Sequence, residues 1–436
     1  MELEVLAVVL ITTLMLLLFS GIPVAFALIL SGILAFWLGA GSQGLQFVGI
    51  VFWTKTFTFK FLAVPLFVYM GFLLQESGLV AALFRAFNLW LGRLPGSLGV
   101  VALAASTVFA AMSGSGAAAG ATLGSVIAPE IRKYGFNTRL ILGCLNGGAS
   151  LAPLIPPSVA LIVYSTLTDV PLTRLFAAGL FPGLLMSFFM FLYVVVISIH
   201  KPHLAPRSTM VVSWGERFRS LSVFPVVGAV IFIVLGGIFL GWFTPSESAA
   251  VGVVVSIGVV ALYSRLNPRK ILLAVYAGTR EATVVAVFIM ALIVGGSIFS
   301  NVLNFLGLPQ MVAAMLVEAD LGILEFLLIL SAILLVMGMF IDAITIQVLT
   351  VPFILPVLSA LGIDMVWFGI YLVFWVEIGT FTPPYGLHLF VLQGVMKASY
   401  SDAVIGAAPF IPIWMVGIVL LYVFPELALW LPSKLY

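Results

Sequence analysis

Two ionisable residues stand out because they lie within apolar stretches of the chain. Asp342 lies between two apolar runs, and Glu377 precedes Thr380 by three residues in another apolar run. A charged side chain in apolar surroundings is costly, so such residues usually serve a function. Either carboxyl group could bind a cation or relay a proton. The alternative is a carboxyl group that is kept neutral or paired and only stabilises its local structure.

Two further apolar stretches are interrupted by a double proline with hydroxyl groups beside it. The first is Ala-Pro-Leu-Ile-Pro-Pro-Ser at 152–158, and the second is Gly-Thr-Phe-Thr-Pro-Pro-Tyr-Gly at 379–386. Proline lacks a backbone donor and disfavours the helical conformation of the residue before it, so each pair should unwind a helix. The freed carbonyl groups can bind a sodium ion, and the N-terminus of the next helix favours an anion. Each interruption therefore predicts a cation site beside an anion site.

Each interruption follows a pair of short apolar arms with a distinctive tip. The arms 97–109 and 117–128 flank Met-Ser-Gly-Ser-Gly, and the arms 324–336 and 344–355 flank Gly-Met-Phe-Ile-Asp. A membrane span needs about 20 residues, so these arms predict two re-entrant hairpins. The structural alternative is that the prolines only kink packed helices and the glycines only allow close packing. The hydroxyl groups could also be satisfied by their own helices.

Histidine and cysteine chemistry is weakly indicated. His200 and His203 lie in a polar segment without nearby thiols, so a zinc enzyme is not expected. His388 follows the second double proline, where a packed or interfacial imidazole is the alternative to a functional role. The single cysteine, Cys144, is expected to be a small buried apolar side chain.

The composition is that of an all-α polytopic membrane protein. Of the 436 residues, 63% are hydrophobic and 8% are charged, whereas about 25% are charged in soluble domains. The net charge of +2 and the scatter of basic residues among loops exclude a nucleic-acid partner. There is no phosphate-binding loop for ATP hydrolysis. Candidate spans, each a mostly apolar run, are 6–20, 22–38, 61–74, 179–199, 221–242, 246–263, 284–305 and 402–424.

Basic residues predict the orientation of these spans. Lys and Arg accumulate in cytoplasmic loops, which places the polar connector 200–220 in the cytoplasm and the N-terminus outside. The segment 41–60 carries Trp53 and Lys55 and is expected to form a helix along the membrane interface.

An internal repeat relates the two halves of the chain. Residues of the two halves match at a separation of 227 positions, in the pairs Pro129 and Pro356, Gly135 and Gly362, Pro156 and Pro383, Pro157 and Pro384, Gly179 and Gly406, and Pro182 and Pro409. The first repeat is 1–199, with a hairpin at 97–129 and a broken helix at 139–168. The second is 221–436, with a hairpin at 324–358 and a broken helix at 365–395. Because the first starts outside and the second inside, the repeats should be inverted, as in many secondary transporters.

With these features the sequence closely resembles the large membrane subunit of tripartite ATP-independent periplasmic (TRAP) transporters. The matching segments span nearly the whole chain and are Gly-Ile-Pro-Val-Ala-Phe at 21–26, Pro-Leu-Phe at 65–67, 113–116, Pro-Glu at 129–130, 155–158, 338–342 and 377–384. One departure is that Trp375 and Val376 stand where an asparagine is expected before Glu377. The resemblance implies a sodium-coupled elevator-type importer rather than an enzyme.

The resemblance also implies partners and binding residues. The partners are a small membrane subunit of four helices and a soluble periplasmic protein that delivers a carboxylate such as a C4-dicarboxylate, sialic acid or a sugar acid. The location is the cytoplasmic inner membrane of a bacterium or archaeon. Candidate sodium ligands, at the tips and breaks, are Ser113, Gly114, Ser115, Ser150, Pro156, Gly338, Asp342, Gly379, Thr380, Thr382 and Pro383. Candidate substrate-binding residues are Ser115, Pro156, Pro157, Ser158, Thr382, Pro384 and Tyr385.

Two other functions are compatible with parts of the pattern. A stand-alone sodium-driven carrier of divalent carboxylates would share the hairpins and repeats but need no binding protein. An intramembrane hydrolase that uses Asp342 or Ser115 would turn over without a sodium gradient, and no motif favours it.

Overall fold

The computed structural model describes residues 3–56, 59–134, 136–204, 213–318 and 322–436. Within these ranges every regular element is a helix. Seven of the described helices are long and apolar enough to cross a membrane, or eight if the bent pair α3–α4 counts as one span. The protein is therefore a multi-pass membrane protein, as predicted. Part of the predicted connector, residues 205–212, lies outside the described residues.

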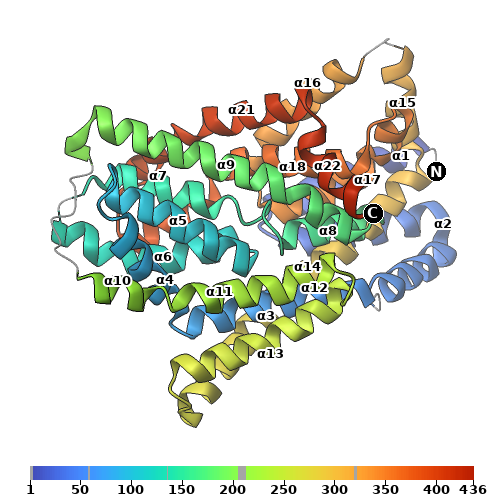
Figure 1. The fold of residues 1–436 in the computed structure, drawn as a ribbon. Helices are drawn as coiled ribbons and strands as arrows, with labels where there is room; N and C mark the ends of the chain where they lie inside the picture. The colour runs from blue at the N-terminus through green and yellow to red at the C-terminus, as the bar shows by residue number, and fades with distance from the viewer. Residues whose placement is uncertain (1–2, 57–58, 135, 205–212, 319–321) are drawn as a thin grey trace.

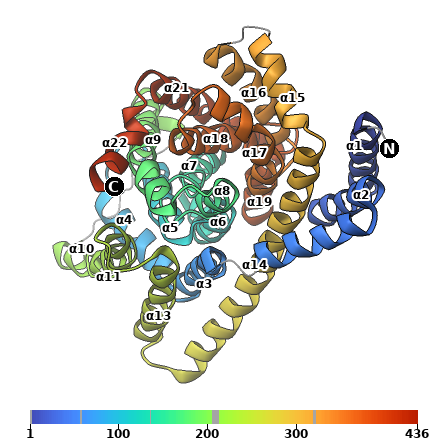
Figure 2. The ribbon, with the colours of Figure 1, turned by 90° about the vertical axis from the view of Figure 1, so that its right-hand side faces the viewer.

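The N-terminal helices α1 (Leu3–Phe19) and α2 (Val24–Thr56) stand apart from the main bundle (Figure 2). Gly41 interrupts α2 with a backbone conformation (φ 59°, ψ −135°) that favours glycine. The helix therefore divides where the sequence predicts the end of one span and the start of the next helix. α2 packs mainly along α14 (Pro268–Phe305), the longest described helix.

A second group of helices connects α14 with the main bundle. α3 (Ala63–Glu76) and α4 (Leu79–Leu91) meet at a bend of 63°, where Gly78 has a φ of 84°. α13 (Pro245–Tyr263) packs against α3, and α14 crosses α3 as well. The short helix α10 (Trp214–Ser220) leads into α11 (Val223–Ile231), a π-helical turn at 232–236 and α12 (Gly237–Phe239).

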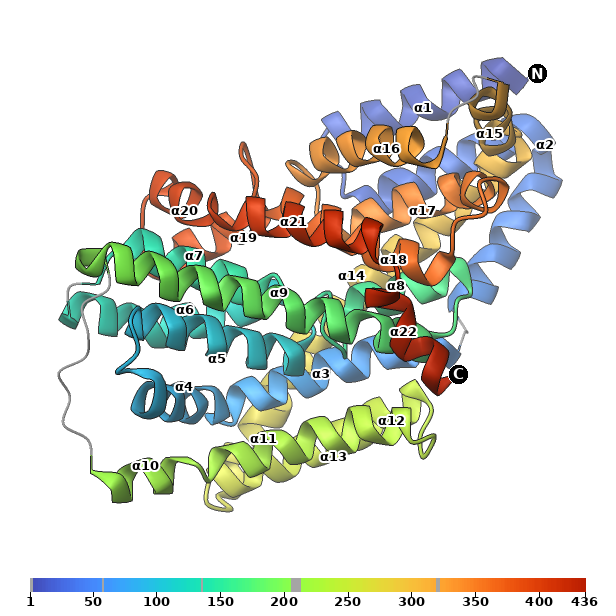
Figure 3. The same cartoon turned by 45° about the horizontal axis from the view of Figure 1, so that its top comes forward.

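Two helical hairpins bring their tips to the middle of the main bundle. α5 (Ser97–Ser113) and α6 (Gly116–Tyr134) form one, and α16 (Ile323–Gly338) and α17 (Ala343–Ala360) form the other. They approach the middle of the molecule from opposite ends (Figures 1 and 3). Both tips fall where the sequence predicts them. The first turns at Gly114, whose φ is 64°, and the second at Asp342, which caps α17.

Each hairpin is followed by a helix that is broken at the double proline. α7 (Thr138–Ala149) and α8 (Val159–Thr168) flank the first break, and α18 (Met365–Thr380) and α19 (Leu387–Met396) flank the second. The first break is wholly buried, and several of its backbone N–H groups bond within the segment, such as that of Ile155 to the carbonyl oxygen of Leu151. The second break differs because Pro383, Pro384 and Tyr385 are exposed.

The remaining helices surround this centre. They are α9 (Leu172–His200), α15 (Leu308–Glu318), α20 (Tyr400–Ala407), α21 (Phe410–Val423) and α22 (Glu426–Leu435). α9 begins at Leu172 rather than at the predicted Gly179, and α14 begins at Pro268 rather than at Val284. The sequence did not predict α4, α15 or α22 as separate helices.

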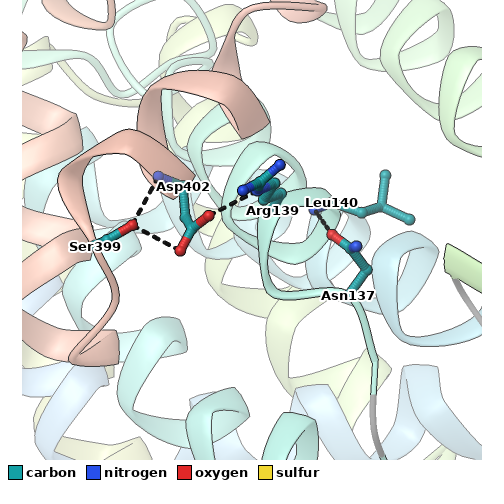
Figure 4. A network of polar contacts seen from close by, with 5 residues as sticks. All are labelled: Asn137, Arg139, Leu140, Ser399 and Asp402. Carbon is teal, nitrogen blue, oxygen red and sulfur yellow. Dashed lines mark hydrogen bonds and ion pairs between the residues drawn. The ribbon is translucent and has the colours of Figure 1, made fainter.

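Close packing of α7 on α20 joins the first and second halves of the chain. A methyl group built on Gly406 would lie 3.1 Å from the backbone nitrogen of Gly143. Beside this contact Arg139 Nε donates to Asp402 Oδ1 over 2.6 Å (Figure 4). Ser399 fixes the same carboxylate by donating its hydroxyl to Oδ2 over 2.7 Å. Small residues thus allow the approach, and an exposed ion pair links the two helices beside it.

Candidate functional site

The two hairpin tips and the two broken helices surround one cavity with a volume of about 160 Å³. Residues of both halves line it, together with side chains of α3 and α14. The hairpins contribute 113–118 and 342–344, the broken helices contribute Pro153, Val159, Ala160, Glu377, Leu387 and His388, and the two flanking helices contribute Val68, Gly71, Phe72, Gln75, Val285 and Ile289. The cavity therefore lies where the predicted site regions converge.

The first hairpin tip touches the first break directly. A methyl group built on Gly114 would lie 2.6 Å from the carbonyl oxygen of Pro157. The turn is held by Ser113 Oγ, which accepts from the backbone N–H of Ser115 over 3.4 Å. Ser115 Oγ in turn accepts from the backbone N–H of Ala118 over 3.4 Å, at the start of α6. Both serines reach the cavity wall from this turn.

The second hairpin tip touches the second break in the same manner. A methyl group on Gly338 would lie 2.6 Å from the Cα atom of Gly379. The backbone N–H of Gly386 also donates to the carbonyl oxygen of Met339 over 3.4 Å. Gly386 has a φ of 59°, a conformation that glycine adopts readily, and it begins the turn into α19.

Asp342 has a structural role at the tip of its hairpin. Its Oδ1 accepts from the backbone N–H groups of Ile344 and Thr345, each over 3.1 Å, and its Oδ2 accepts from the Thr345 hydroxyl. An N-cap of this kind satisfies donors that the first turn of a helix leaves free. The carboxylate still lines the cavity, so it combines the structural role with a place in the site.

The hydroxyl groups at the breaks bond mainly to their own segments, as the structural alternative expected. Each donates to a nearby backbone carbonyl oxygen, in the pairs Ser150 to Gly147, Ser158 to Pro153, Thr380 to Glu377, and Thr382 to Ile378. Ser158 Oγ also accepts from the backbone N–H of Leu161 and so caps α8. A hydroxyl oxygen has two lone pairs, so these groups retain acceptor capacity.

The candidate residues divide into three sets. Ser113, Gly114, Ser115 and Asp342 line the cavity. The break residues, beside the cavity, are Ser150, Pro156, Pro157, Ser158, Gly379, Thr380, Thr382, Pro383 and Pro384, and Gly338 lies against them. Tyr385 differs because it is 47% exposed and packs against Phe390, with ring centroids 4.6 Å apart. It is not among the cavity-lining residues.

Other cavity residues were not predicted as part of the site. Gly71 and Gln75 come from α3, and Val285 and Ile289 come from α14. These residues belong to mostly apolar runs in the sequence, and such runs gave no local signal of a binding function. Only the spatial convergence of distant segments reveals that these helices close the cavity.

Glu377 and His388 form a buried polar pair in the cavity wall. Glu377 is 1% exposed and His388 is 7% exposed. Glu377 Oε2 and His388 Nδ1 lie 3.9 Å apart, and neither atom has a hydrogen-bond partner. The imidazole packs against Gly116, where an added methyl group would lie 2.8 Å from Cε1. The sequence singled out both residues, but it could not predict that they face each other.

Comparison with known proteins identifies the family. The model of the tripartite ATP-independent periplasmic transporter, DctM component, matches residues 11–427. The chain belongs to this family. It is 30% identical over 432 residues to the C4-dicarboxylate TRAP transporter large permease of Vibrio cholerae, with 95% of each chain covered. It is 32% identical over 419 residues to the sialic acid TRAP transporter large permease of the same species, with 96% of each covered.

These relatives are permease subunits and not enzymes, and this TRAP large permease is likewise an inner-membrane permease. The fold resembles that of the YdaH transporter of Alcanivorax borkumensis, with a TM-score of 0.62. That similarity covers 88% of this chain and 89% of the other at 17% identity. It therefore supports the helical fold alone.

Proposed function

We propose that this chain is the large membrane subunit of a sodium-coupled, binding-protein-dependent importer of organic acids. The observation that carries the proposal is the set of four helix N-termini at one cavity. The first two residues of α6, α8, α17 and α19 all line it, at 116–117, 159–160, 343–344 and 387–388. Helix N-termini favour anions because their first backbone N–H groups lack intrahelical acceptors. Ser115, Ser158 and Asp342 already cap some of these groups at α6, α8 and α17, so the anion would bind the N–H groups that the caps leave free.

Sodium binding would use the C-terminal ends of the four helices that precede these N-termini in the chain. α5, α7, α16 and α18 end next to the tips and breaks, so their last carbonyl groups lie close to the cavity. Helix C-termini carry partial negative charge and favour cations. We place one sodium ion near the contact of Gly114 with Pro157 and a second near the contact of Gly338 with Gly379. Carbonyl and hydroxyl oxygens would serve as the ligands.

The movement would be that of an elevator built from two inverted repeats. The hairpins and broken helices pack on one another and form a unit that includes both proposed sodium sites. α2, α3, α13 and α14 pack on one another and form a separate scaffold. The cavity lies between them, since α3 and α14 close one side. Sliding of the unit along the scaffold would carry substrate and sodium together.

The proposed cargo and partners follow from the family. The relatives are named for C4-dicarboxylate and for sialic acid, both of which carry carboxylate groups. We extend this to carboxylates as the substrate class. The family is tripartite by name, so a small membrane subunit and a soluble periplasmic binding protein are the expected partners. This membership favours the tripartite system over a stand-alone carrier.

Uptake by reconstituted liposomes tests the proposal. Liposomes with the large and small subunits should accumulate a carboxylate only when the binding protein is outside and sodium is supplied from the same side. Omission of the binding protein or replacement of sodium by potassium should reduce uptake to background. Sodium-driven uptake by this chain alone would contradict the tripartite proposal and support the stand-alone carrier.

A further inference from the structure

We propose that a cavity between α4, α10, α11 and α13 binds the phosphate group of an anionic phospholipid from the surrounding membrane. This basic cavity has a volume of about 770 Å³, and among the described residues it shares no lining residue with the cavity of the candidate site. Its lining combines arginine side chains with an apolar wall. The inference does not depend on the proposed function, because a lipid can occupy the site whatever the chain transports.

Two arginine side chains in the lining are available to bind an anion. Arg85 of α4 and Arg219 of α10 are exposed, and neither side chain forms an ion pair or a hydrogen bond with any described residue. Among the described lining residues Glu216 alone is acidic, and its Oε2 accepts from the backbone N–H and the hydroxyl of Ser213. Each guanidinium group offers five N–H donors in a planar fork that fits phosphate oxygens. The two arginines therefore keep their donors for a ligand.

The walls of the basic cavity are held together by contacts between α4 and its neighbours. Trp90 Nε1 of α4 donates to the backbone carbonyl oxygen of Arg217 in α10 over 3.2 Å. The Trp90 ring also meets Phe218 edge to face, with ring centroids 6.1 Å apart. Phe87 and Phe224 make the same kind of contact between α4 and α11, with centroids 5.3 Å apart. A ligand would therefore meet a preformed site, which lowers the cost of ordering on binding.

The apolar part of the lining favours a lipid over a small soluble anion. Leu89, Val226 and Leu262 contribute to it, and Leu262 is 62% exposed. Acyl chains can cover these side chains, whereas a free phosphate ion would leave them bare. Arg219 precedes the apolar run of α11, and α13 ends at Tyr263 in the lining, so the basic cavity lies where two spans end. Lipid headgroups lie at that level of the membrane.

The charge of the neighbouring loop indicates the cytoplasmic leaflet. Arg265, Arg269 and Lys270 follow α13, and such clusters accumulate on the cytoplasmic side. Anionic lipids give that surface a negative potential, and basic pockets between membrane helices on this side bind anionic headgroups. Phosphatidylglycerol is therefore the probe. Phosphatidylethanolamine with the same acyl chains is the comparison, because its ammonium group would be repelled by the two arginines.

Native mass spectrometry of the purified full-length chain in detergent tests the inference. The fraction of protein that carries one added lipid gives the dissociation constant for each of the two lipids. We expect the wild type to bind phosphatidylglycerol at least fivefold more tightly than phosphatidylethanolamine. Arg85→Gln and Arg219→Gln should each weaken binding of phosphatidylglycerol about fivefold, since one basic residue near an anionic lipid surface contributes about 1 kcal/mol. The double variant should weaken it at least tenfold.

Matched variants separate the basic cavity from general surface charge. Arg93→Gln combined with Arg269→Gln removes the same two charges from exposed positions outside the lining, and should leave the affinity for phosphatidylglycerol within about twofold. Ala82→Phe keeps both arginines but fills part of the apolar space, and should weaken binding without any change of charge. Arg85→Gln and Arg219→Gln change exposed side chains, so these variants should fold like the wild type.

Four results would overturn the inference. The first two are equal binding of both lipids by the wild type and an equal loss of binding in the variant that lacks Arg93 and Arg269. The third is displacement of phosphatidylglycerol by millimolar inorganic phosphate, because the site would then take a free anion. The fourth is loss of the binding that depends on Arg85 and Arg219 when the small membrane subunit is added, which would assign the basic cavity to a protein partner.

Discussion

Gly338 and Gly379 meet backbone to backbone where the second hairpin touches the second broken helix. A methyl group on Gly338 would lie 2.6 Å from the Cα atom of Gly379, closer than real contacts allow. Neither residue has a positive φ, so the requirement for glycine comes from the space available and not from the backbone conformation. The contact fixes the position of the hairpin tip relative to the break.

The first prediction concerns this contact. Gly379→Ala should lower the thermal midpoint of the protein and reduce sodium-driven uptake at least tenfold. Overpacking of this kind destabilises by about 1–3 kcal/mol, and here it also displaces one proposed sodium site. Gly394→Ala is the matched control, because a methyl group there meets nothing within 4 Å. Wild-type uptake in Gly379→Ala would show that the tip can move away from the break without functional consequence.

The second prediction compares two kinds of contact between α7 and α20. Gly406→Ala should destabilise strongly, since its methyl group would overlap the carbonyl oxygen of Arg139. Arg139→Gln removes the ion pair with Asp402, in which both side chains are substantially exposed, and should destabilise by at most about 1 kcal/mol. Thermal unfolding in detergent measures both. A larger effect of Arg139→Gln would mean that the ion pair, and not the close packing, holds the helices together.

The third prediction concerns the proposed sodium sites. Ser115→Ala and Thr382→Ala should each raise the sodium concentration needed for half-maximal uptake several-fold while leaving the amount of protein in the membrane nearly unchanged. The reason is that each hydroxyl bonds within its own segment and still has acceptor capacity for a cation. Thr279→Ala is a control, because Thr279 is exposed, its hydroxyl bonds to Val275 of the same helix, and it does not line the cavity. Unchanged sodium activation in both variants would refute the proposed placement.

The positions of the hairpins and breaks could be predicted from the sequence because proline and glycine mark them locally. The first tip was predicted at 112–116 and lies at Gly114, and the double prolines at 156–157 and 383–384 fall in the two breaks. The start of α14 was missed because Arg269, Lys270 and Arg280 interrupt its apolar pattern. Those charges lie in the part of α14 that precedes its buried stretch.

The composition of the cavity could be predicted only in part. Ser113, Gly114, Ser115 and Asp342 were candidates from their tips alone and do line it. The approach of His388 to Gly116 joins residues that are far apart in the chain, and no local pattern encodes such a contact. The sequence alone could not decide whether Asp342 binds a cation or caps a helix, since a carboxylate at a hairpin tip is suited to both roles.

The last prediction tests movement of the transport unit along the scaffold. Gly296 of α14 and Val348 of α17 face each other across the proposed sliding surface, and a Cβ atom on Gly296 would lie 3.3 Å from that of Val348. Disulfides join Cβ atoms about 3.5–4.5 Å apart, so cysteines at both positions should form a bridge after a small adjustment.

Oxidation of the double variant Gly296→Cys with Val348→Cys should reduce uptake to background, and reduction should restore it. Each single-cysteine variant serves as a control for the substitutions themselves. The native Cys144 does not compete, because it is fully buried in α7. If fully cross-linked protein transports with the same rate constant as protein whose disulfide has been reduced, then α14 and α17 do not slide past each other. The elevator proposal would then have to place its moving boundary elsewhere.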